Sequence, residues 1–322
     1  MAKRGVDALL KSLSSSANPS ADEINRGLAS GQWVVIEAAA KASKNVPAGD
    51  VAGGLAAVLQ RLINGMADPN AAAAIAVIEA MRHHQLNERE LFREAILYQR
   101  IEKGFGEGID VGSAVRAGAC FALVESGDPS AALMLAGVLF ERPTSPNVAD
   151  SPAARIAAAR GLGAVGDRDA SAVLRIKLLH SALDSTDVIG ECLGSLVALA
   201  DEQAMPTLEA ALLRYPEAAA DAVIPVAESQ SPTALSALRL LRDSLRLSGE
   251  EELAMIGFAL LRSAEGTDAL FEALVDRPPT VAKAAAKALH LQRRDPAISE
   301  RFDRIAAELL NERELREAFN HG

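Results

Sequence analysis

The chain has 322 residues and a formal net charge of −10 at pH 7; hydrophobic residues make up 49% of it and aromatic ones only 3%, so its apolar side chains are mainly alanine, leucine and valine. Acidic residues outnumber basic ones over residues 71–238, which argues against nucleic acid as a partner, because affinity for phosphates comes largely from clustered cations. No apolar run approaches the ~20 residues of a membrane-spanning helix, and the first residues lack the continuous apolar stretch of a signal peptide. Alanine and leucine favour helices, and we therefore expect an all-α protein that is cytoplasmic and not inserted in a membrane.

Residues 1–31 are predicted to form an N-terminal cap for the rest of the chain. Within them Ser20 is followed three residues later by Glu23, the spacing of a capping box, in which two residues satisfy each other's backbone N–H groups at a helix start. The same pattern recurs in the run Asn-Glu-Arg-Glu-Leu. It predicts a helix N-cap at Asn87, with Glu90 at the third helical position.

Two loops interrupt the helical pattern at corresponding places in consecutive repeats, at residues 102–112 and 141–151. Loops that join equivalent helices of stacked repeats project from the same side, so we expect the two to be neighbours and to form one accessory contact edge. Phe105 and Arg142 are its candidate binding residues. The glycines around Phe105 lack the preceding strand and the Lys-Ser/Thr of a phosphate-binding loop, so we interpret them as a turn. The alternative is that both loops are tolerated surface insertions.

The stretch from 151 to 213 shows a pair of helices twice in succession. Its predicted helices are 154–162, 170–180, 188–196 and 204–213, with a turn at Gly166 and Asp167 between the first two. A helix pair that recurs every ~30 to 40 residues is typical of an α-solenoid, in which each pair buries its apolar face only against its neighbours. The motif of the second helix ends at Ala42, Met81, Leu123, Leu162, Leu196, Val226, Leu260 and Leu289. We therefore expect a repeat array over residues 32–294 and a C-terminal capping segment over 295–322.

A proline interrupts one of the later repeats. Pro225 lies inside the predicted helix 217–229. Because proline removes a backbone donor and clashes with the preceding turn of a helix, this helix is predicted to be bent or short.

The residue types that most often carry chemistry are sparse. Cys120 and Cys192 fall inside predicted helices and are interpreted as small core residues. The five histidines are too scattered for a metal site, and we interpret His83 and His84 as a solvated helix end. We expect no metal, no cofactor and no catalytic residue.

The segments 113–119 and 154–159, each followed by a leucine and a Gly-Asp turn, resemble HEAT repeats, most of all the short bacterial kind also found in phycobilisome-lyase-like proteins. The resemblance covers about residues 110–290. It implies a right-handed superhelix of about eight HEAT-like helical hairpins. In that family an Arg commonly pairs with an Asp in a ladder between repeats, which implies the pairs Asp110 with Arg116 and Asp150 with Arg155. Elsewhere the Arg position is occupied by Ile189, Ala219, Leu253 or Ala282.

One position of the repeated helix supplies candidate binding residues. The second helices of such arrays line the usual contact face. We expect a row there formed by Glu79, Phe121, Arg160, Ile224, Phe258 and Lys287. Aromatic and Arg side chains are frequent anchors of protein interfaces. A rotation of the helices by one position would instead place Phe121 and Phe258 in the core, and that alternative is equally open.

Two hypotheses of different class follow. The first is a non-enzymatic HEAT-repeat scaffold that mediates protein–protein interactions, and the acidic middle of the chain is compatible with a basic partner protein. The second is a HEAT-like lyase-type enzyme or enzyme subunit that acts on a modified protein or a bound cofactor, and it rests on the resemblance alone. A HEAT-like DNA-binding glycosylase is the third and least favoured hypothesis, because the acidic charge of residues 71–238 disfavours contact with DNA phosphates.

Overall fold

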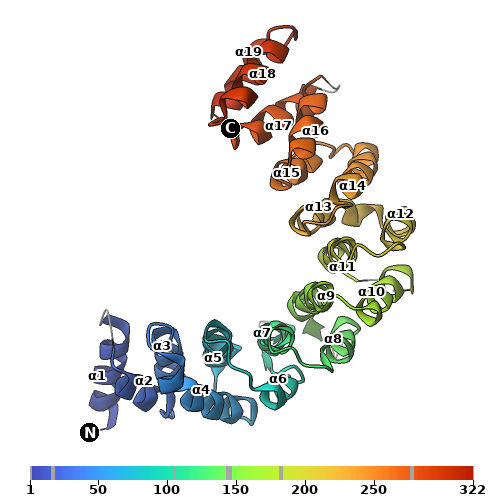
Figure 1. The fold of residues 1–322 in the computed structure, drawn as a ribbon. Coiled ribbons are helices and arrows are strands. Elements are labelled where there is room, and N and C mark those ends of the chain that lie inside the picture. The colour runs from blue at the N-terminus through green and yellow to red at the C-terminus, as the bar shows by residue number, and fades with distance from the viewer. Residues whose placement is uncertain are drawn as a thin grey trace. The chain divides into compact units, whose positions relative to one another are not determined.

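The computed structural model describes residues 2–15, 19–103, 106–142, 147–180, 184–275 and 279–321. Helices make up nearly all the secondary structure of these residues, beside three short strands, so the all-α prediction is confirmed. The chain divides into two compact units, residues 1–165 and 166–322, whose α-helices are labelled in Figure 1. The predicted caps at 1–31 and 295–322 lie in the first and second unit respectively, and their capping role stays a prediction.

The helices of the first unit form two layers, and successive helices belong to one layer and the other in turn. Its elements are α1 (Ala2–Ser15), α2 (Ala21–Leu28), α3 (Trp33–Ser43), α4 (Ala48–Ile63), the 3-10 turn η1 (Pro69–Ala71), α5 (Ala72–His83), α6 (Arg89–Ala95), β1 (Ile101–Lys103), β2 (Gly108–Asp110), α7 (Gly112–Glu125), α8 (Ala131–Leu139), β3 (Val148–Ala149) and α9 (Ala153–Val165). The odd-numbered helices α3, α5, α7 and α9 pack each against the next, and α2, α4 and α6 do the same in a second layer. Each helix pair therefore contacts the pairs beside it in the chain.

The second unit has the same organisation. Its helices are α10 (Arg168–His180), α11 (Thr186–Ala198), α12 (Ala204–Arg214), the 3-10 turn η2 (Pro216–Ala218), α13 (Ala219–Glu228), α14 (Ala234–Ser248), α15 (Leu253–Leu260), α16 (Ala264–Leu274), α17 (Pro279–His290), α18 (Pro296–Ala306) and α19 (Glu312–His321). The odd-numbered helices from α11 to α19 again pack in succession, while α10, α12 and α14 form the other layer. The predicted helices between 168 and 213 match α10, α11 and α12 to within a few residues.

One predicted capping box is confirmed and the other is wrong. The Ser20 hydroxyl accepts a hydrogen bond from the Glu23 amide, and the Glu23 carboxylate accepts one from the Ser20 amide. In contrast, α6 begins at Arg89 with Glu88 at the N-cap, and the Asn87 side chain accepts a bond from the Arg89 guanidinium instead. The Arg89 guanidinium also binds the Ser126 carbonyl at the end of α7, so a contact between repeats overrides the local pattern.

A left-handed residue follows each odd-numbered helix from α5 to α15 within two positions. These residues are Gln85, Gly127, Gly166, Ala200, Gln230 and Arg262. Glycine adopts this backbone conformation without the steric penalty that a Cβ brings, yet only two of the six are glycine. The Gly-Asp turn seen in the sequence is thus one version of a turn that recurs after each odd-numbered helix from α5 to α15.

Helix α11 is buried on all sides from Val188 to Val197. Two glycines one turn apart allow its close approach to α13: a Cβ on Gly190 would lie 2.6 Å from the backbone of Asp221, and one on Gly194 would lie 2.6 Å from the carbonyl carbon of Pro225. Pro225 lies inside α13, which follows a 3-10 turn and has 10 residues, so the prediction of a short helix is confirmed.

Replacing Gly194 with alanine is expected to lower the stability of the second unit, because the new methyl group would overlap the backbone of α13. Overpacking of this kind costs ~1–3 kcal/mol. The control is Gly137→Ala in α8, where a Cβ meets nothing within 4 Å. That change should raise stability by up to ~1 kcal/mol, because alanine is the better helix former. Urea unfolding followed by circular dichroism measures both, and equal midpoints for Gly194→Ala and the parent would contradict the close-packing argument.

Candidate functional site

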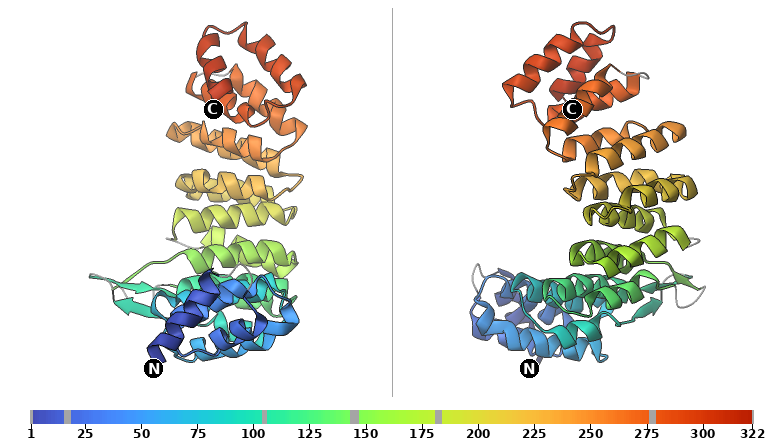
Figure 2. Two further views of the ribbon diagram at one scale, coloured as in Figure 1. Left: turned by 90° about the vertical axis from the view of Figure 1, so that its left-hand side faces the viewer. Right: turned by 45° about the vertical axis from the view of Figure 1, so that its right-hand side comes forward.

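The two insertions of the first unit meet in a three-stranded sheet. Strand β2 pairs with β1 in antiparallel fashion and with β3 in parallel, in the register Ile109 opposite Glu102 and Ala149. The Gly108 amide also donates to the Asn147 carbonyl at 2.8 Å. The insertions at 102–112 and 141–151 are therefore neighbours, as predicted, although they contain strands where we expected only loops. Figure 2 shows these strands reaching beyond the ends of the helices of the first unit.

The sheet and the helix ends beside it expose apolar side chains. Ile101 and Ile109 are 46% and 52% exposed, and Leu97 and Phe140, just after α6 and α8, are 68% and 42% exposed. We call these four residues the insertion edge. Of the two predicted loop residues, Arg142 is exposed and directly follows Glu141 in the chain. Phe105 lies outside the described residues.

Both predicted Asp-Arg pairs form, and the first does more than pair. The Arg116 guanidinium is 5% exposed and donates to Asp110 at 2.8 Å, to Glu141 at 3.1 Å and to the Tyr98 carbonyl at 2.9 Å. Because these partners lie on β2, at the end of α8 and after α6, a single side chain of α7 ties both insertions to the helices. Two of these partners, Tyr98 and Glu141, directly follow the exposed Leu97 and Phe140 in the chain, so the Arg116 guanidinium also holds the backbone beside these two side chains.

The second pair is bidentate. The Arg155 guanidinium donates to the two carboxylate oxygens of Asp150 at 2.8 and 2.6 Å and is itself 5% exposed. Both arginines pair with an aspartate that precedes their own helix.

In the second unit the cation comes from a different helix. Asp184, which precedes α11, pairs at 2.5 Å with Lys177 of α10, and both side chains are buried. Glu251, which precedes α15, binds Arg242 and Arg246 of α14 at 2.6 and 2.7 Å. Sequence reasoning missed these pairs because it looked for an Arg in the odd-numbered helix. The signal present in the chain was an acidic residue before that helix and a basic residue near the end of the preceding one.

The Glu141 carboxylate is half-buried, and its burial disfavours the ionised form. Burial raises its pKa above the ordinary value, while the neighbouring Arg116 guanidinium opposes the shift. The buried thiol of Cys120 has its pKa raised to about 12 by the same desolvation, so it is not a thiolate at neutral pH. Both cysteines are buried and free, which confirms the prediction that they are core residues.

The predicted row of binding residues is only partly accessible. Glu79, Arg160, Ile224 and Lys287 are exposed, and Phe121 is half-buried beneath the Arg82 guanidinium, 4.8 Å from its ring centroid. Phe258 is 1% exposed, because the short apolar helix α15 packs against α13, α14, α16 and α17. The assignment of Phe258 as an accessible anchor is therefore corrected, and the core alternative holds for it.

A groove of about 850 Å³ in the first unit includes part of that row. Its charges join neighbouring helices: Lys44 binds Glu79 at 3.2 Å, and Arg82 binds Glu125 at 2.9 and 2.6 Å. The histidines beside it lie at the end of α5, where His83 is exposed, as predicted, and His84 is half-buried. The Nε2 atoms of His83 and His84 lie 3.1 and 2.9 Å from the carbonyls of Lys44 and Ser43, so both rings satisfy the end of α3.

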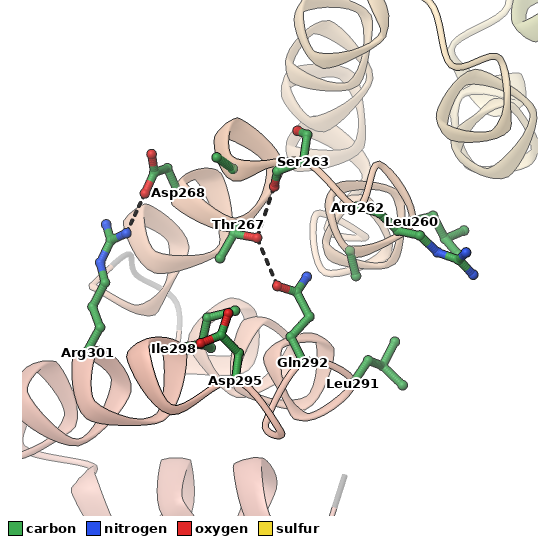
Figure 3. A pocket seen from close by; sticks show the side chains of 12 residues that line it. Leu260, Arg262, Ser263, Thr267, Asp268, Leu291, Gln292, Asp295, Ile298 and Arg301 are labelled. Carbon is green, nitrogen blue, oxygen red and sulfur yellow. Dashed lines mark hydrogen bonds and ion pairs between the residues drawn. The ribbon is translucent and has the colours of Figure 1, made fainter.

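A second groove, of about 860 Å³, lies in the second unit between the turns after α15 and α17 (Figure 3). The Thr267 hydroxyl lies 2.9 Å from the side-chain amide oxygen of Gln292 and 3.0 Å from the backbone carbonyl of Ser263. Asp268 forms an ion pair with Arg301, which stacks over the Phe271 ring at 4.1 Å. These polar groups are engaged with one another, so the groove is a feature of packing between hairpins.

No protein-family model matches the chain, and no curated protein matches it. Among the described residues there is no group of three or more His, Cys, Asp or Glu placed to hold a metal ion. None of the described helices is both long enough and apolar enough to span a bilayer.

Arg116→Ala should destabilise the first unit by ~3 kcal/mol, because it leaves Asp110 and Glu141 partly buried without their counter-ion. Arg142→Ala removes an exposed cation one residue from Glu141 and should change stability by less than ~0.5 kcal/mol. Thermal unfolding of both variants measures the contrast. An Arg116→Ala protein as stable as the Arg142→Ala protein would contradict the structural role of the Arg116 bonds.

Glu141 makes a pH-dependent contribution whose sign follows from its raised pKa. A carboxyl whose pKa is higher in the folded than in the unfolded state favours folding while it is protonated, and that contribution is lost as the pH rises through the folded pKa. Glu141→Gln should therefore gain stability relative to the parent between pH 4 and pH 7, since the amide never ionises. Melting temperatures across this range measure the difference. Glu107→Gln, an exposed substitution on the other insertion, is the control, and a constant or falling difference for Glu141→Gln would refute the assignment.

Proposed function

We propose that this protein is a non-enzymatic scaffold that binds another protein through the insertion edge. The carrying observation is the pairing of β2 with β3, which joins insertions from consecutive hairpins into one sheet with exposed isoleucines. Each strand is two or three residues long, and such a small sheet lacks independent stability. The helices below therefore have to supply the rigidity, and the buried Arg116 bonds do so.

The chemistry of the edge supports a protein partner. Exposed apolar side chains that lie close together are typical of interaction sites. A surface held in place before binding loses little entropy on contact, which favours affinity for a given area. Ile101 and Ile109 lie close together on neighbouring strands, on opposite faces of the sheet, because Glu102 is the residue opposite Ile109. Together with Leu97 and Phe140 they are exposed on segments that Arg116 holds.

We further propose that the helix pairs form a HEAT-like α-solenoid, a right-handed superhelix of about eight hairpins. Contacts between successive odd-numbered helices and between successive even-numbered helices, within each unit, support this arrangement. In such arrays the stability comes from the interfaces between neighbours. The alternative, a HEAT-like lyase-type enzyme or enzyme subunit, rests on the resemblance alone.

The binding proposal is tested by affinity capture from the native cell, with variants of the edge compared against a matched control. Ile101→Ser combined with Ile109→Ser should abolish capture of the partner protein, while the helical circular dichroism spectrum stays unchanged. Leu213→Ser and Leu247→Ser are the control, because these leucines are 88% and 90% exposed in the second unit.

A variant of Phe121, in the predicted row of binding residues, tests whether that row and not the insertion edge binds the partner. Phe121→Ala should leave capture intact if the insertion edge is the binding site. Capture that survives the isoleucine changes and fails with Phe121→Ala would overturn the assignment to the insertion edge.

A further inference from the structure

A strained turn lies at the start of α5, on the side of the first unit where β1 runs. Asn70 and Ala71 have φ values of 56° and 53°, two successive residues in the left-handed region. Asparagine tolerates this region, but alanine adopts it at a steric cost, because its Cβ approaches the following carbonyl oxygen. Strain of this kind persists only where the surroundings enforce it, and it gathers at functional or switching segments.

Two carboxylates bond to the backbone of the turn and of the helix start that follows it. Asp68 is fully buried and accepts hydrogen bonds from the amides of Ala73 and Ala74, at 3.0 and 2.9 Å, which caps α5. The second carboxylate comes from the insertion: Glu102 of β1 accepts a hydrogen bond from the Asn70 amide at 3.0 Å.

Arg100 fixes this second carboxylate. Its guanidinium donates to Glu102 at 3.1 Å and to the carbonyl of Met66 at 3.4 Å. The backbone before the turn, the turn itself and β1 are therefore linked through one carboxylate and one guanidinium. Glu102 lies opposite Ile109 in the register of the sheet, so the same strand pair carries the link and the insertion edge.

We propose that the Asn70–Ala71 turn is a strained element that the insertion sheet holds through Glu102, and that it couples the insertion edge to helix α5. A displacement of β1 withdraws the acceptor of the Asn70 amide and allows the turn to relax, which loosens the start of α5. The coupling exists whether or not the proposed function is correct. With that function, contact at the edge changes the order of α5, which carries Glu79 and Arg82 of the groove in the first unit.

Amide hydrogen exchange of the full chain tests the coupling. Glu102→Ala should speed exchange of the amides of residues 70–74 by about tenfold, the effect of losing one charge-assisted hydrogen bond at the turn. Glu107→Ala, an exposed substitution on the same insertion, is the control and should leave this exchange unchanged. A circular dichroism spectrum equal to that of the parent shows that each variant is folded. Unchanged exchange at residues 70–74 in the folded Glu102→Ala protein would overturn the proposal.

A second substitution separates held strain from a simple local bond. Ala71→Gly removes the steric cost of the left-handed conformation, so the effect of Glu102→Ala on exchange should be clearly smaller in an Ala71→Gly background. Coupling is reciprocal, so Ala71→Gly alone should also change exchange at the amides of β1 and β2. An effect of Glu102→Ala of equal size in both backgrounds would show that Glu102 makes only a local bond, and it would reject the coupling.

Discussion

The packing of each helix pair against the next is the constraint on which the rest of the structure depends. A single pair of short helices cannot bury its apolar face alone, and within each unit the contacts run between neighbouring pairs. The distance between neighbours is set by small side chains, as where Gly190 and Gly194 of α11 meet the backbone of α13. The left-handed residue after each odd-numbered helix from α5 to α15 follows from the same requirement, because the chain has to reverse direction at a fixed place to return along its partner.

Charges are arranged around this packing. A carboxylate that precedes an odd-numbered helix lies near the interface between pairs, so it requires a counter-ion or backbone donors. Different helices supply them: Arg116 and Arg155 from the odd-numbered helix itself, Lys177 from the preceding even-numbered helix, and backbone amides of α5 for Asp68. The common requirement is therefore neutralisation at that place, and the identity and origin of the partner vary.

The insertions are likewise held by bonds to each other and to the neighbouring helices. Their backbone groups pair with each other in β1, β2 and β3, and their side chains reach down to the helices through Asp110, Glu102 and Glu141. The strands that expose Ile101 and Ile109 can stay ordered because Asp110 and Glu102 on the same strands are bonded to α7 and to the start of α5. Ordered backbone and exposed apolar side chains are the two properties that favour a role in binding.

The sequence by itself determined the helical class, the alternation of helix pairs, the capping box at Ser20 and the short α13, because each depends on residues close together in the chain. The pairs of Arg116 and Arg155 were implied by the resemblance to HEAT repeats. Only the tertiary structure decided which helix supplies the partner of Asp184, that Phe258 is buried, that His83 and His84 bind the end of α3, and that two insertions 40 residues apart share a sheet in the register Gly108 to Val148. The physical reason is that helical periodicity specifies a face but not the neighbour that covers it. The neighbour follows from the rotation and spacing of the packed helices, which no single segment of the chain contains.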